Sequence, residues 1–323
     1  MTAPMGVLVM AYGTASGPDD IERYYTDIRG GRAPLPEHLA ELRDRYAAIG
    51  NVFPLLDTTR AQAAGLVDRL NGDETTYRAY LGMKHSAPTI SEAVIRMRDD
   101  GIERAVGIVM APHWSGMSVE SYVERVRGAV DELGGGPTLS FVRNYHAHPS
   151  FVKFLATRVS DALEDLDPAD RSGTIVLFTA HSLPTRIEDD GSLRCKTCDC
   201  AGSCRYRDGL QETADLVAET IGLGSYGVAW QSAGRTADPW WGPPVEESIL
   251  EAAAMGHRAV IVCSAGFVAD HLEILYDLDI EAKAVAEGAR IRFARTKMPN
   301  ADPEYLDVLA EVARDHLAEA PRA

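Results

Sequence analysis

The chain has 323 residues, of which 46% are hydrophobic, enough for one large domain or two medium-sized ones. Its formal net charge of -16 argues against nucleic acid as a partner, and it holds no apolar run of about 18 residues for stable membrane insertion. Because the N-terminus also lacks the basic flank and cleavage site of a signal peptide, we expect a cytoplasmic protein with reduced cysteines.

Short runs rich in Val, Ile and Leu alternate with longer amphipathic stretches along the chain. The short runs predict strands at 5–11, 75–82, 105–112, 138–144, 173–180, 226–232, 258–264 and 290–295. The longer stretches predict helices at 37–49, 57–70, 88–100, 118–133, 149–166, 208–222, 245–255, 270–287 and 302–318. Strands separated by helices predict an α/β fold with buried parallel sheets.

The eight predicted strands fall into two groups of four, which indicates two similar α/β halves. We place the boundary after residue 148, giving an N-terminal half of 1–148 and a C-terminal half of 149–323 that ends in a helix. Ligands of open parallel sheets bind at the carboxyl ends of the strands, where Tyr12, Lys84, His113 and His181 occur. This pattern predicts a cleft between the halves, while no dinucleotide or P-loop motif is present.

An acidic row follows the strand predicted at 258–264. Glu273, Asp277 and Glu281 stand at i, i+4 and i+8 of the predicted helix and would line one face, with His271 beside them. Like charges at this spacing repel by about 0.2–0.5 kcal/mol per pair, so water, a cationic partner or a hard metal ion must compensate. His181, at the end of another strand, is either structural or a proton acceptor or metal ligand.

Two further patterns carry chemistry. Arg29 and Arg32 flank a Gly-Gly pair and could present guanidinium groups to carboxylates. The loop 191–206 holds Cys195, Cys198, Cys200 and Cys204, a spacing that suits zinc or an iron–sulfur cluster. The set is too compact for two separate zinc knuckles, and a reducing compartment disfavours disulfides.

Several ordered motifs resemble those of the ferrochelatases, above all the coproporphyrin ferrochelatases of monoderm bacteria. They are Ala11-Tyr-Gly-Thr, Tyr24-Tyr-Thr-Asp-Ile-Arg, Arg45-Tyr-Ala-Ala-Ile-Gly, Gly82-Met-Lys-His, Met110-Ala-Pro-His, Ala180-His-Ser-Leu-Pro, Trp230-Gln-Ser-Ala-Gly, Asp238-Pro-Trp and Gly266-Phe-Val-Ala-Asp-His-Leu-Glu. The resemblance spans the chain and implies two Rossmann-like halves with a porphyrin in the cleft between them. It also implies insertion of ferrous iron, the metal substrate, with release of two pyrrole protons.

The resemblance implies a role for individual positions as well. His181 and Glu273 are the expected catalytic pair, acting on the porphyrin and its iron, while Asp277 and Glu281 match an outer metal site. The expected porphyrin-binding positions are Tyr12, Arg29, Arg45, Tyr46, Phe53, Lys84, His85 and Tyr122. Bacillus-type members carry Arg where this chain has Gly30, and Ser is common where it has Phe53, so substrate contacts differ at both positions.

Some bacterial ferrochelatases carry a 2Fe-2S cluster, so the resemblance favours this cofactor over zinc for the four cysteines. We expect coproporphyrin III as the substrate, since residues 33–39 do not resemble an apolar membrane-dipping segment. Protoporphyrin IX is the alternative substrate, a non-catalytic porphyrin or haem carrier the alternative class, and a cobalt chelatase a third option. Transient contact with neighbouring enzymes of haem synthesis is a further expectation.

Overall fold

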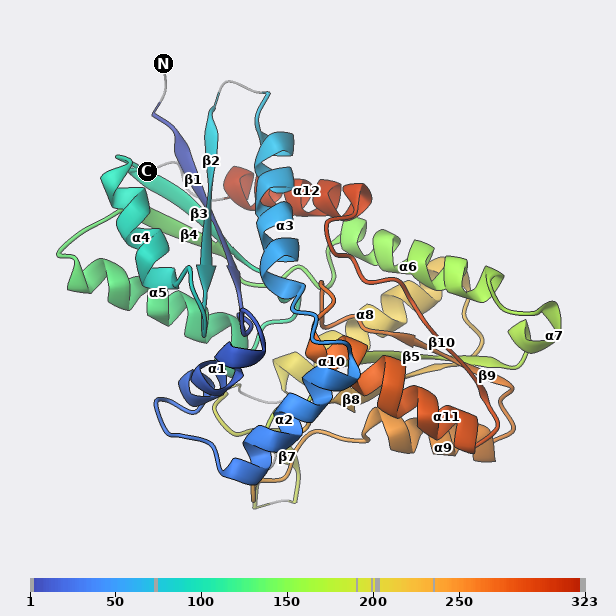
Figure 1. Ribbon diagram of the computed structural model, residues 1–323. Helices are drawn as coiled ribbons and strands as arrows, with labels where there is room; N and C mark the ends of the chain where they lie inside the picture. The colour runs from blue at the N-terminus through green and yellow to red at the C-terminus, as the bar shows by residue number, and fades with distance from the viewer. Residues whose placement is uncertain are drawn as a thin grey trace.

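Two four-stranded parallel sheets form the centre of the structure, a computed structural model that describes residues 3–72, 75–189, 191–198, 200, 204–234 and 236–319 (Figure 1). The first sheet has the order β2-β1-β3-β4, with strands β1 (Met5–Ala11), β2 (Tyr77–Met83), β3 (Arg104–Val109) and β4 (Thr138–Val142). The second has the order β10-β9-β5-β8, with strands β5 (Thr174–His181), β8 (Tyr226–Gln231), β9 (Ala259–Cys263) and β10 (Arg292–Arg295). Counted within its own half, each sheet has the same strand order, so the halves share one topology and the predicted fold class is confirmed.

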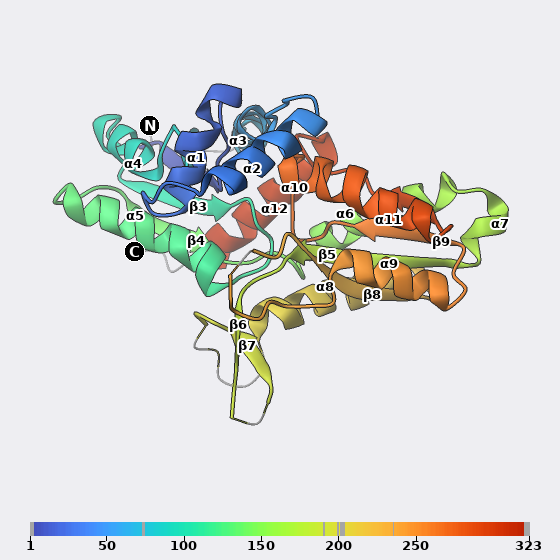
Figure 2. The ribbon, with the colours of Figure 1, turned by 60° about the horizontal axis from the view of Figure 1, so that its bottom comes forward.

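Helices cover both faces of each sheet (Figures 1 and 2). On the first sheet, one face carries α3 (Leu55–Leu70) and α12 (Pro303–Glu319), and the other carries α4 (Ile90–Asp99) and α5 (Ser121–Glu132). On the second sheet, one face carries α6 (Pro149–Glu164) and α8 (Arg205–Ile221), and the other carries α9 (Val245–Ala254) and α11 (Lys283–Gly288).

Burial on both faces explains why the strands have almost continuous apolar sequences. In β1, Val7 and Val9 belong to the core cluster beneath α3 and α12. Leu8 and Met10 point the other way, into the cluster beneath α4 and α5. Because successive strand residues alternate between faces, a strand covered on both sides needs an apolar residue at nearly every position.

The remaining elements do not belong to the two sheets or to the helices named above that cover them. They are η1 (Pro18–Asp20), α1 (Ile21–Ile28), α2 (Pro36–Ala48), η2 (Gly116–Glu120), α7 (Pro168–Arg171), β6 (Thr185–Ile187), β7 (Leu193–Cys195), α10 (Leu272–Leu275) and η3 (Asp277–Ala282). Strands β6 and β7 form a hairpin that projects from the second half (Figure 2). Helices α1 and α2 form a small core of their own, on which Leu272 of α10 packs.

The helix predicted over 270–287 is confirmed as a helical segment, but it is not one continuous α-helix. The segment divides into α10, the π-helix η3 and α11. The amide of Glu281 donates to the carbonyl of Tyr276, five residues earlier, which widens the helical turn at this point. The wide turn includes Asp277, whose side chain is buried within the structure rather than exposed on the surface of a helix.

Helix α12 belongs to the second half in sequence but packs on both halves. It contacts α3 of the first half and α6 of the second. The hydroxyl of Tyr305, in α12, is 3.0 Å from the hydroxyl of Tyr145, which follows β4 in the first half. Because α12 packs on both halves, the boundary predicted after residue 148 divides the chain by sequence only and stays a prediction.

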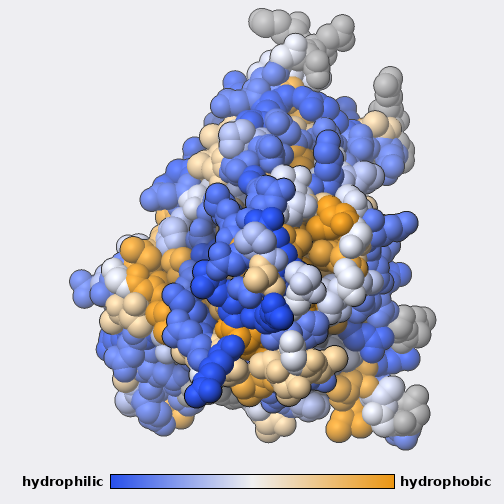
Figure 3. Space-filling view, turned by 90° about the vertical axis from the view of Figure 1, so that its right-hand side faces the viewer, coloured by the Kyte–Doolittle hydropathy of each residue, from blue (hydrophilic) through white to orange (hydrophobic). Residues whose placement is uncertain are grey.

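The outer surface of the second half is largely hydrophilic. Figure 3 shows this face with only separate hydrophobic areas between polar ones. Among the residues that the structure describes, no helix combines the length and apolar character needed to cross a membrane.

Candidate active site

The strand order places the candidate site where the two sheets meet. In each half the chain reverses direction across the sheet beside its first strand, at the β1–β3 and β5–β9 neighbours. Such switch points open a crevice at the carboxyl ends of the strands. Tyr12 follows β1, His181 ends β5, and Glu273 lies in α10 after β9, so all three occupy these positions.

At the centre, the Glu273 carboxylate lies between two imidazoles. Its Oε1 is 3.6 Å from His181 Nε2, and its Oε2 is 3.6 Å from His271 Nε2. The side chains of His181 and Glu273 are each 34% exposed, so they can meet a ligand in the cleft. The sequence places His271 beside the acidic row, and the structure brings it as close to Glu273 as His181.

Backbone contacts fix the orientation of both imidazoles. His181 Nδ1–H donates to the carbonyl of Ser182, and His271 Nδ1–H donates to the carbonyl of Ala269 at 2.9 Å. With Nδ1 protonated, each neutral ring directs an Nε2 lone pair at Glu273. Only a proton or a metal ion between Nε2 and the carboxylate can make that arrangement attractive.

The pKa values agree with a shared positive charge. Burial lowers the pKa of His181, but the charge and hydrogen bonding of Glu273 outweigh it, and the pKa rises to about 9. The pKa of His271 is raised by Glu273 against the same effect of burial. Burial raises the pKa of Glu273, yet the two imidazoles hold it well below its usual range. Glu273 is thus a carboxylate paired with protonated histidine in the free protein.

The backbone that carries this trio is fixed by buried polar contacts. Gln231 Nε2–H donates to the carbonyl of Glu273 at 3.1 Å, while Thr179 and Ser264 hydroxyls both donate to Gln231 Oε1. The Tyr206 hydroxyl donates to the carbonyl of His181 at 2.9 Å. These hydrogen bonds fix the backbone positions of His181 and Glu273 relative to β8 and α8.

A glycine permits the close approach of the two strand ends. A Cβ atom at Gly266 would stand 2.4 Å from the Cβ of Ala180, the residue before His181. Any side chain at position 266 would therefore push the segment carrying Glu273 away from β5.

The outer carboxylates have a cationic partner from the other half. Arg45 Nη1 is 3.5 Å from Asp277 Oδ1, and Arg45 Nη2 is 3.7 Å from Glu281 Oε1. Asp277 is only 4% exposed and accepts a hydrogen bond from Ser232, whose backbone is left-handed at φ 57°. Burial and the charge of Glu273 raise the pKa of Asp277 to about 7. Water, a cationic partner or a metal ion could compensate the negative charge of the acidic row, and in this structure the cationic side chain of Arg45 does so.

Tyr12, Lys84, His85 and Tyr122 lie together on the first half. The Tyr12 and His85 rings are 4.6 Å apart, and Lys84 Nζ stands 5.2 Å from the centre of the Tyr122 ring. Burial and the charge of Glu273 raise the pKa of Tyr12, so the Tyr12 hydroxyl lies within electrostatic reach of Glu273 from the other half. Lys84 Nζ is also 5.9 Å from the centre of the Tyr12 ring, which makes these four side chains one surface.

The remaining predicted contacts lie on α2, at the end of α1 and in the segment after α2. Tyr46 is buried, and Phe53 stacks on it at 4.6 Å, so Phe53 supports Tyr46 from the small core of these helices. Arg29 Nε is buried without a hydrogen-bond partner, which leaves a cationic donor unsatisfied. Arg45 turns towards Asp277 and Glu281 instead. Gly30 has φ 66°, so an arginine at this position would be strained.

Three of the four loop cysteines are buried, and Cys200 is half-buried. Cys195 Sγ lies 2.8 Å from Cys204 Sγ and accepts from Trp241 Nε1–H at 3.4 Å. The amide of Gly116, from the first half, donates to Cys198 Sγ at 3.4 Å. Hydrogen bonding with Cys195 lowers the pKa of Cys198 and of Cys204 to about 6.

The pKa of Cys195 is raised by its hydrogen bonds with Cys198 and Cys204, and burial raises the pKa of Cys200. Four clustered thiols, two of them with lowered pKa values, and the N–H donors around them are a donor set suited to a thiolate-bound group. Residues 199 and 201–203 of the predicted loop lie outside the described residues. As the side chains stand, no set of three or more His, Cys, Asp or Glu in the described part of the chain is arranged to hold a metal ion.

Several residues around the site carry no sequence signal of their own. Asp27 Oδ2 contacts His85 Nδ1 at 2.7 Å, and Arg125 donates to the carbonyl of Lys84 at 2.8 Å. Ser232 reaches Asp277 only because β8 lies beside β5. His271, by contrast, was already placed beside the acidic row by the sequence, two residues before Glu273.

Comparisons with known proteins point to one family. A family model described as ferrochelatase matches residues 4–317. The coproporphyrin III ferrochelatase of Anoxybacillus flavithermus is 44% identical over 316 residues, covering 97% of this chain and 96% of the relative. Those of Bacillus subtilis and Listeria innocua are 44% identical over 311 residues (95% of this chain, 96% of the relative) and 42% identical over 318 residues (98% and 99%).

Solved structures share the fold at low identity. The sirohydrochlorin chelatase SirB from Bacillus subtilis in complex with cobalt has a TM-score of 0.58 at 10% identity, covering 99% of this chain and 97% of that one. CbiX, described as the terminal enzyme for biosynthesis of sirohaem in denitrifying bacteria, has a TM-score of 0.53 at 14% identity, covering 96% and 98%. These likenesses establish the two-halved chelatase-type fold.

Proposed function

This chain belongs to the ferrochelatase family, and we propose that it inserts ferrous iron into coproporphyrin III, giving Fe-coproporphyrin and two protons in haem synthesis. The observation that carries the proposal is the Glu273 carboxylate held against His181 Nε2 at the meeting point of the two sheets, opposite Tyr12. The relatives named coproporphyrin III ferrochelatase support the choice of porphyrin.

The catalytic pair suits the chemistry of metal insertion. A porphyrin holds its inner protons tightly and is flat, so the enzyme must bend the ring and place a base beside each departing proton. In the free protein Glu273 is ionised and His181 carries the proton between them, so the pair can accept a further proton only after His181 Nε2 has released this one. The pair can thus take up the pyrrole proton and receive iron at one place.

Asp277 and Glu281 offer a route between this pair and solvent. Asp277 lies next to Glu273 with a pKa of about 7, and Glu281 is 38% exposed at the outer end. Carboxylates placed one after another along a route can replace the waters around ferrous iron one by one. Arg45 now balances their charge, so iron entering by this route must displace the Arg45 guanidinium.

Turnover of the two candidate porphyrins tests the substrate. Purified protein with ferrous iron under anaerobic conditions should convert coproporphyrin III faster than protoporphyrin IX, followed by the change in visible absorption. Faster conversion of protoporphyrin IX would reverse the proposal.

Catalysis is tested against simple porphyrin carriage by variants of the pair. His181→Ala and Glu273→Gln should lose iron insertion by at least about a hundredfold, the usual scale of acid–base catalysis, while retaining porphyrin binding. Insertion at the rate of the parent protein in both variants would favour a carrier.

We also propose that Cys195, Cys198, Cys200 and Cys204 hold a 2Fe-2S cluster, with zinc as the alternative. Such a cluster would link the cysteine loop to the first half, since Gly116 donates to Cys198. Iron insertion involves no net electron transfer, so the cluster would serve structure or regulation. Anaerobically purified protein should be coloured, with two iron atoms per chain, and a colourless preparation with stoichiometric zinc would contradict this.

The cytoplasm is the proposed location, supported by the net charge of -16, which disfavours anionic membrane surfaces. Porphyrin transfer through transient contact with neighbouring enzymes of haem synthesis is proposed with it. Fractionation of cells should place the protein with the cytoplasmic enzymes, and crosslinking in cells would capture such contacts.

A further inference from the structure

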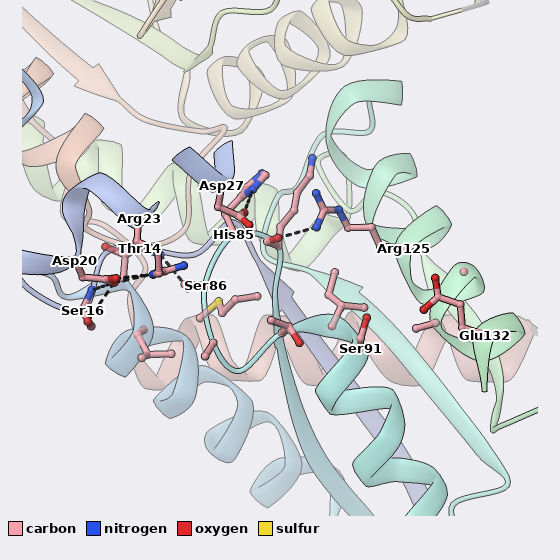
Figure 4. Close-up of a pocket in the computed structure, with 18 residues that line it drawn as sticks. Thr14, Ser16, Asp20, Arg23, Asp27, His85, Ser86, Ser91, Arg125 and Glu132 are labelled. Carbon is pink, nitrogen blue, oxygen red and sulfur yellow. Dashed lines mark hydrogen bonds and ion pairs between the residues drawn. The ribbon is translucent and has the colours of Figure 1, made fainter. Parts of the chain in front are cut away.

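The catalytic pair has different surroundings on the two sides of the cleft. A cavity of about 690 Å³ lies on the first half, between α1, the start of α4 and α5, and neither His181 nor Glu273 lines it (Figure 4). Its charged residues are three carboxylates and three cations, which balance one another: Asp20, Asp27, Glu132, Arg23, Lys84 and Arg125. The contacts that fix the His181 backbone come from the second half, where the cysteine loop (residues 191–206) lies.

The cysteine loop joins the chain next to His181 through the hairpin of β6 and β7. Strand β5 ends at His181, and three residues separate it from Thr185, which pairs with Cys195 across the hairpin. The amide of Lys196 donates to the carbonyl of Pro184 at 2.9 Å, which continues this pairing towards His181. A displacement of Cys195 therefore acts on the chain directly after His181.

Trp241 connects the same cysteine to the residues that follow His181. Its indole N–H donates to Cys195 Sγ at 3.4 Å. Its carbonyl accepts from the Ser182 hydroxyl at 2.8 Å, and its amide donates to the carbonyl of Leu183 at 3.2 Å. Because Trp241 is buried, these hydrogen bonds lie in a low-dielectric interior, where they are stronger than in water. One residue thus contacts both Cys195 and the two residues after His181.

Tyr206 makes a third connection, from the other end of the loop. It lies two residues after Cys204, in the first turn of α8, and its hydroxyl donates to the carbonyl of His181 at 2.9 Å. Its ring is buried 5.5 Å from the Trp230 ring, which limits how far the hydroxyl can turn. Since the Sγ atoms of Cys195 and Cys204 are 2.8 Å apart, the three connections lead to one place in the loop.

We propose that Tyr206 and Trp241 are positioning residues for His181, which make the place of its imidazole in the cleft depend on the arrangement of the cysteine thiols. The inference rests on the proposed function and adds a way in which whatever the thiols bind affects iron insertion. A misplacement of about 1 Å at a reacting group can lower a rate about a hundredfold, so a small shift of the loop is sufficient. The dependence is mutual, because a ligand that fixes His181 also restrains the thiols.

The first measurement is the rate at which the thiols of the anaerobically purified protein react with iodoacetamide, followed by mass spectrometry. Saturating coproporphyrin III should slow the labelling of Cys195 and Cys204 at least about fivefold, the lower end of the usual coupling between two sites. Cys263, fully buried in β9, is the internal reference, because its labelling reports opening of the whole half. The measurement applies to free and to metal-bound thiols, since the loop must open for labelling in either case.

Tyr206→Phe removes only the hydroxyl that reaches His181. This variant should bind coproporphyrin III with a Kd within about twofold of the parent, measured by fluorescence quenching, yet lose most of the thiol protection. Its kcat should fall about tenfold with little change in KM, because the reacting group is misplaced while the porphyrin contacts remain. A purely structural role of Tyr206 would lower stability without separating thiol protection from porphyrin binding.

Tyr226→Phe is the matched control, because it removes an exposed hydroxyl that donates to Asp215 in the same half. It should keep both the thiol protection and the kcat of the parent. If Tyr206→Phe fails to fold, as shown by circular dichroism, Trp241→Phe takes its place. That variant removes the N–H donor of Cys195, keeps the backbone contacts of residue 241, and should lose the protection of Cys195.

Two results would overturn the inference. One is that coproporphyrin III does not slow labelling of the parent thiols relative to Cys263; the other is that Tyr206→Phe keeps both the protection and the kcat of the parent. Failure of the proposed function looks different, because the parent itself would then not insert iron into coproporphyrin III. A parent that inserts iron beside a Tyr206 variant with full protection and full kcat rejects the positioning role alone.

Discussion

At the scale of single residues, His181 stands out because its ring is oriented by the backbone and charged by its neighbour. Nδ1–H is committed to Ser182, so the proton on Nε2 depends on Glu273. A histidine prepared in this way exchanges its proton for a metal ion without turning its ring. The pair is therefore organised before either substrate arrives.

This arrangement predicts a pH-dependent contribution to stability. The pKa of His181 is raised from 6.5 to about 9 in the folded protein, so its contribution is complete below about pH 6.5 and is lost as the pH rises through about 9. Urea unfolding should show wild type more stable than His181→Gln at pH 6, with the difference shrinking by pH 10. In a Glu273→Gln background that pH dependence should vanish, and a difference that stays constant with pH would reject the pairing.

Asp277 should affect the pH dependence of stability in the opposite direction to an ordinary ion-paired carboxylate, because its pKa is raised rather than lowered. Its pKa is raised from 3.8 to about 7, so the folded protein favours the neutral acid and loses stability as the pH rises through about 7. Asp277→Asn, which stays neutral, should raise the Tm at pH 8 and raise it less at pH 5. Glu281→Gln, at a more exposed position, is the control with little effect. A lower Tm for Asp277→Asn at pH 8 would mean that Arg45 stabilises the ionised form more than burial opposes it.

At the scale of elements, the π-helix η3 and helix α2 act as a pair across the cleft. Arg45 from α2 contacts Asp277 and Glu281 of η3, and its guanidinium stands 4.8 Å from the centre of the Tyr276 ring. The wide turn of η3 buries Asp277 while leaving Glu281 partly exposed. The two elements thus form a closed contact at the outer end of the acidic row.

Removing Arg45 should make this row a better cation site. Arg45→Met leaves Asp277 and Glu281 without their positive partner, so we expect Mn²⁺ to bind about tenfold more tightly, measured by titration calorimetry. The control is Arg43→Met on the same helix, α2, which removes only an exposed ion pair with Glu22 of α1. Equal Mn²⁺ affinity in the parent and the Arg45 variant would show that the guanidinium does not compete with cations.

The elements also show what sequence patterns can predict. Strand β1 has the predicted bounds because Val7 to Ala11 is buried on both faces, and burial on both faces dictates composition. The interruption at η3 was missed, since Leu275, Leu278 and Ala282 fit a helical apolar pattern whether the turn is α or π. The hairpin of β6 and β7 was missed as well, because three-residue strands are too short for a periodic pattern.

At the scale of the whole molecule, the site exists because two like halves place their strand ends opposite each other. Tyr12, His181 and Glu273 could be predicted from the rule that ligands gather at strand ends. Asp27 and Arg125 could not, because their positions depend on how α1 and α5 pack on the sheet rather than on any motif. Sequence patterns thus predict residues fixed by strands better than residues fixed by the placement of helices.

The relative position of the halves depends in part on α12. Tyr305 is fully buried in this helix, and its ring packs near Phe151 and Phe154 of α6 while its hydroxyl meets Tyr145. Since α12 also packs on α3, loss of this aromatic side chain should loosen both halves at once.

Tyr305→Ala should therefore lower the free energy of unfolding by about 3–5 kcal/mol, the usual cost of deleting a buried aromatic ring. Tyr305→Phe removes only the hydroxyl contact with Tyr145 and should cost about 1 kcal/mol. Calorimetry should show one transition in the parent protein and one in each variant, moved to lower temperature, because α12 makes the halves unfold together. Two separate transitions in the parent, with only one of them moved by Tyr305→Ala, would show that the halves are independent and that α12 belongs energetically to one of them.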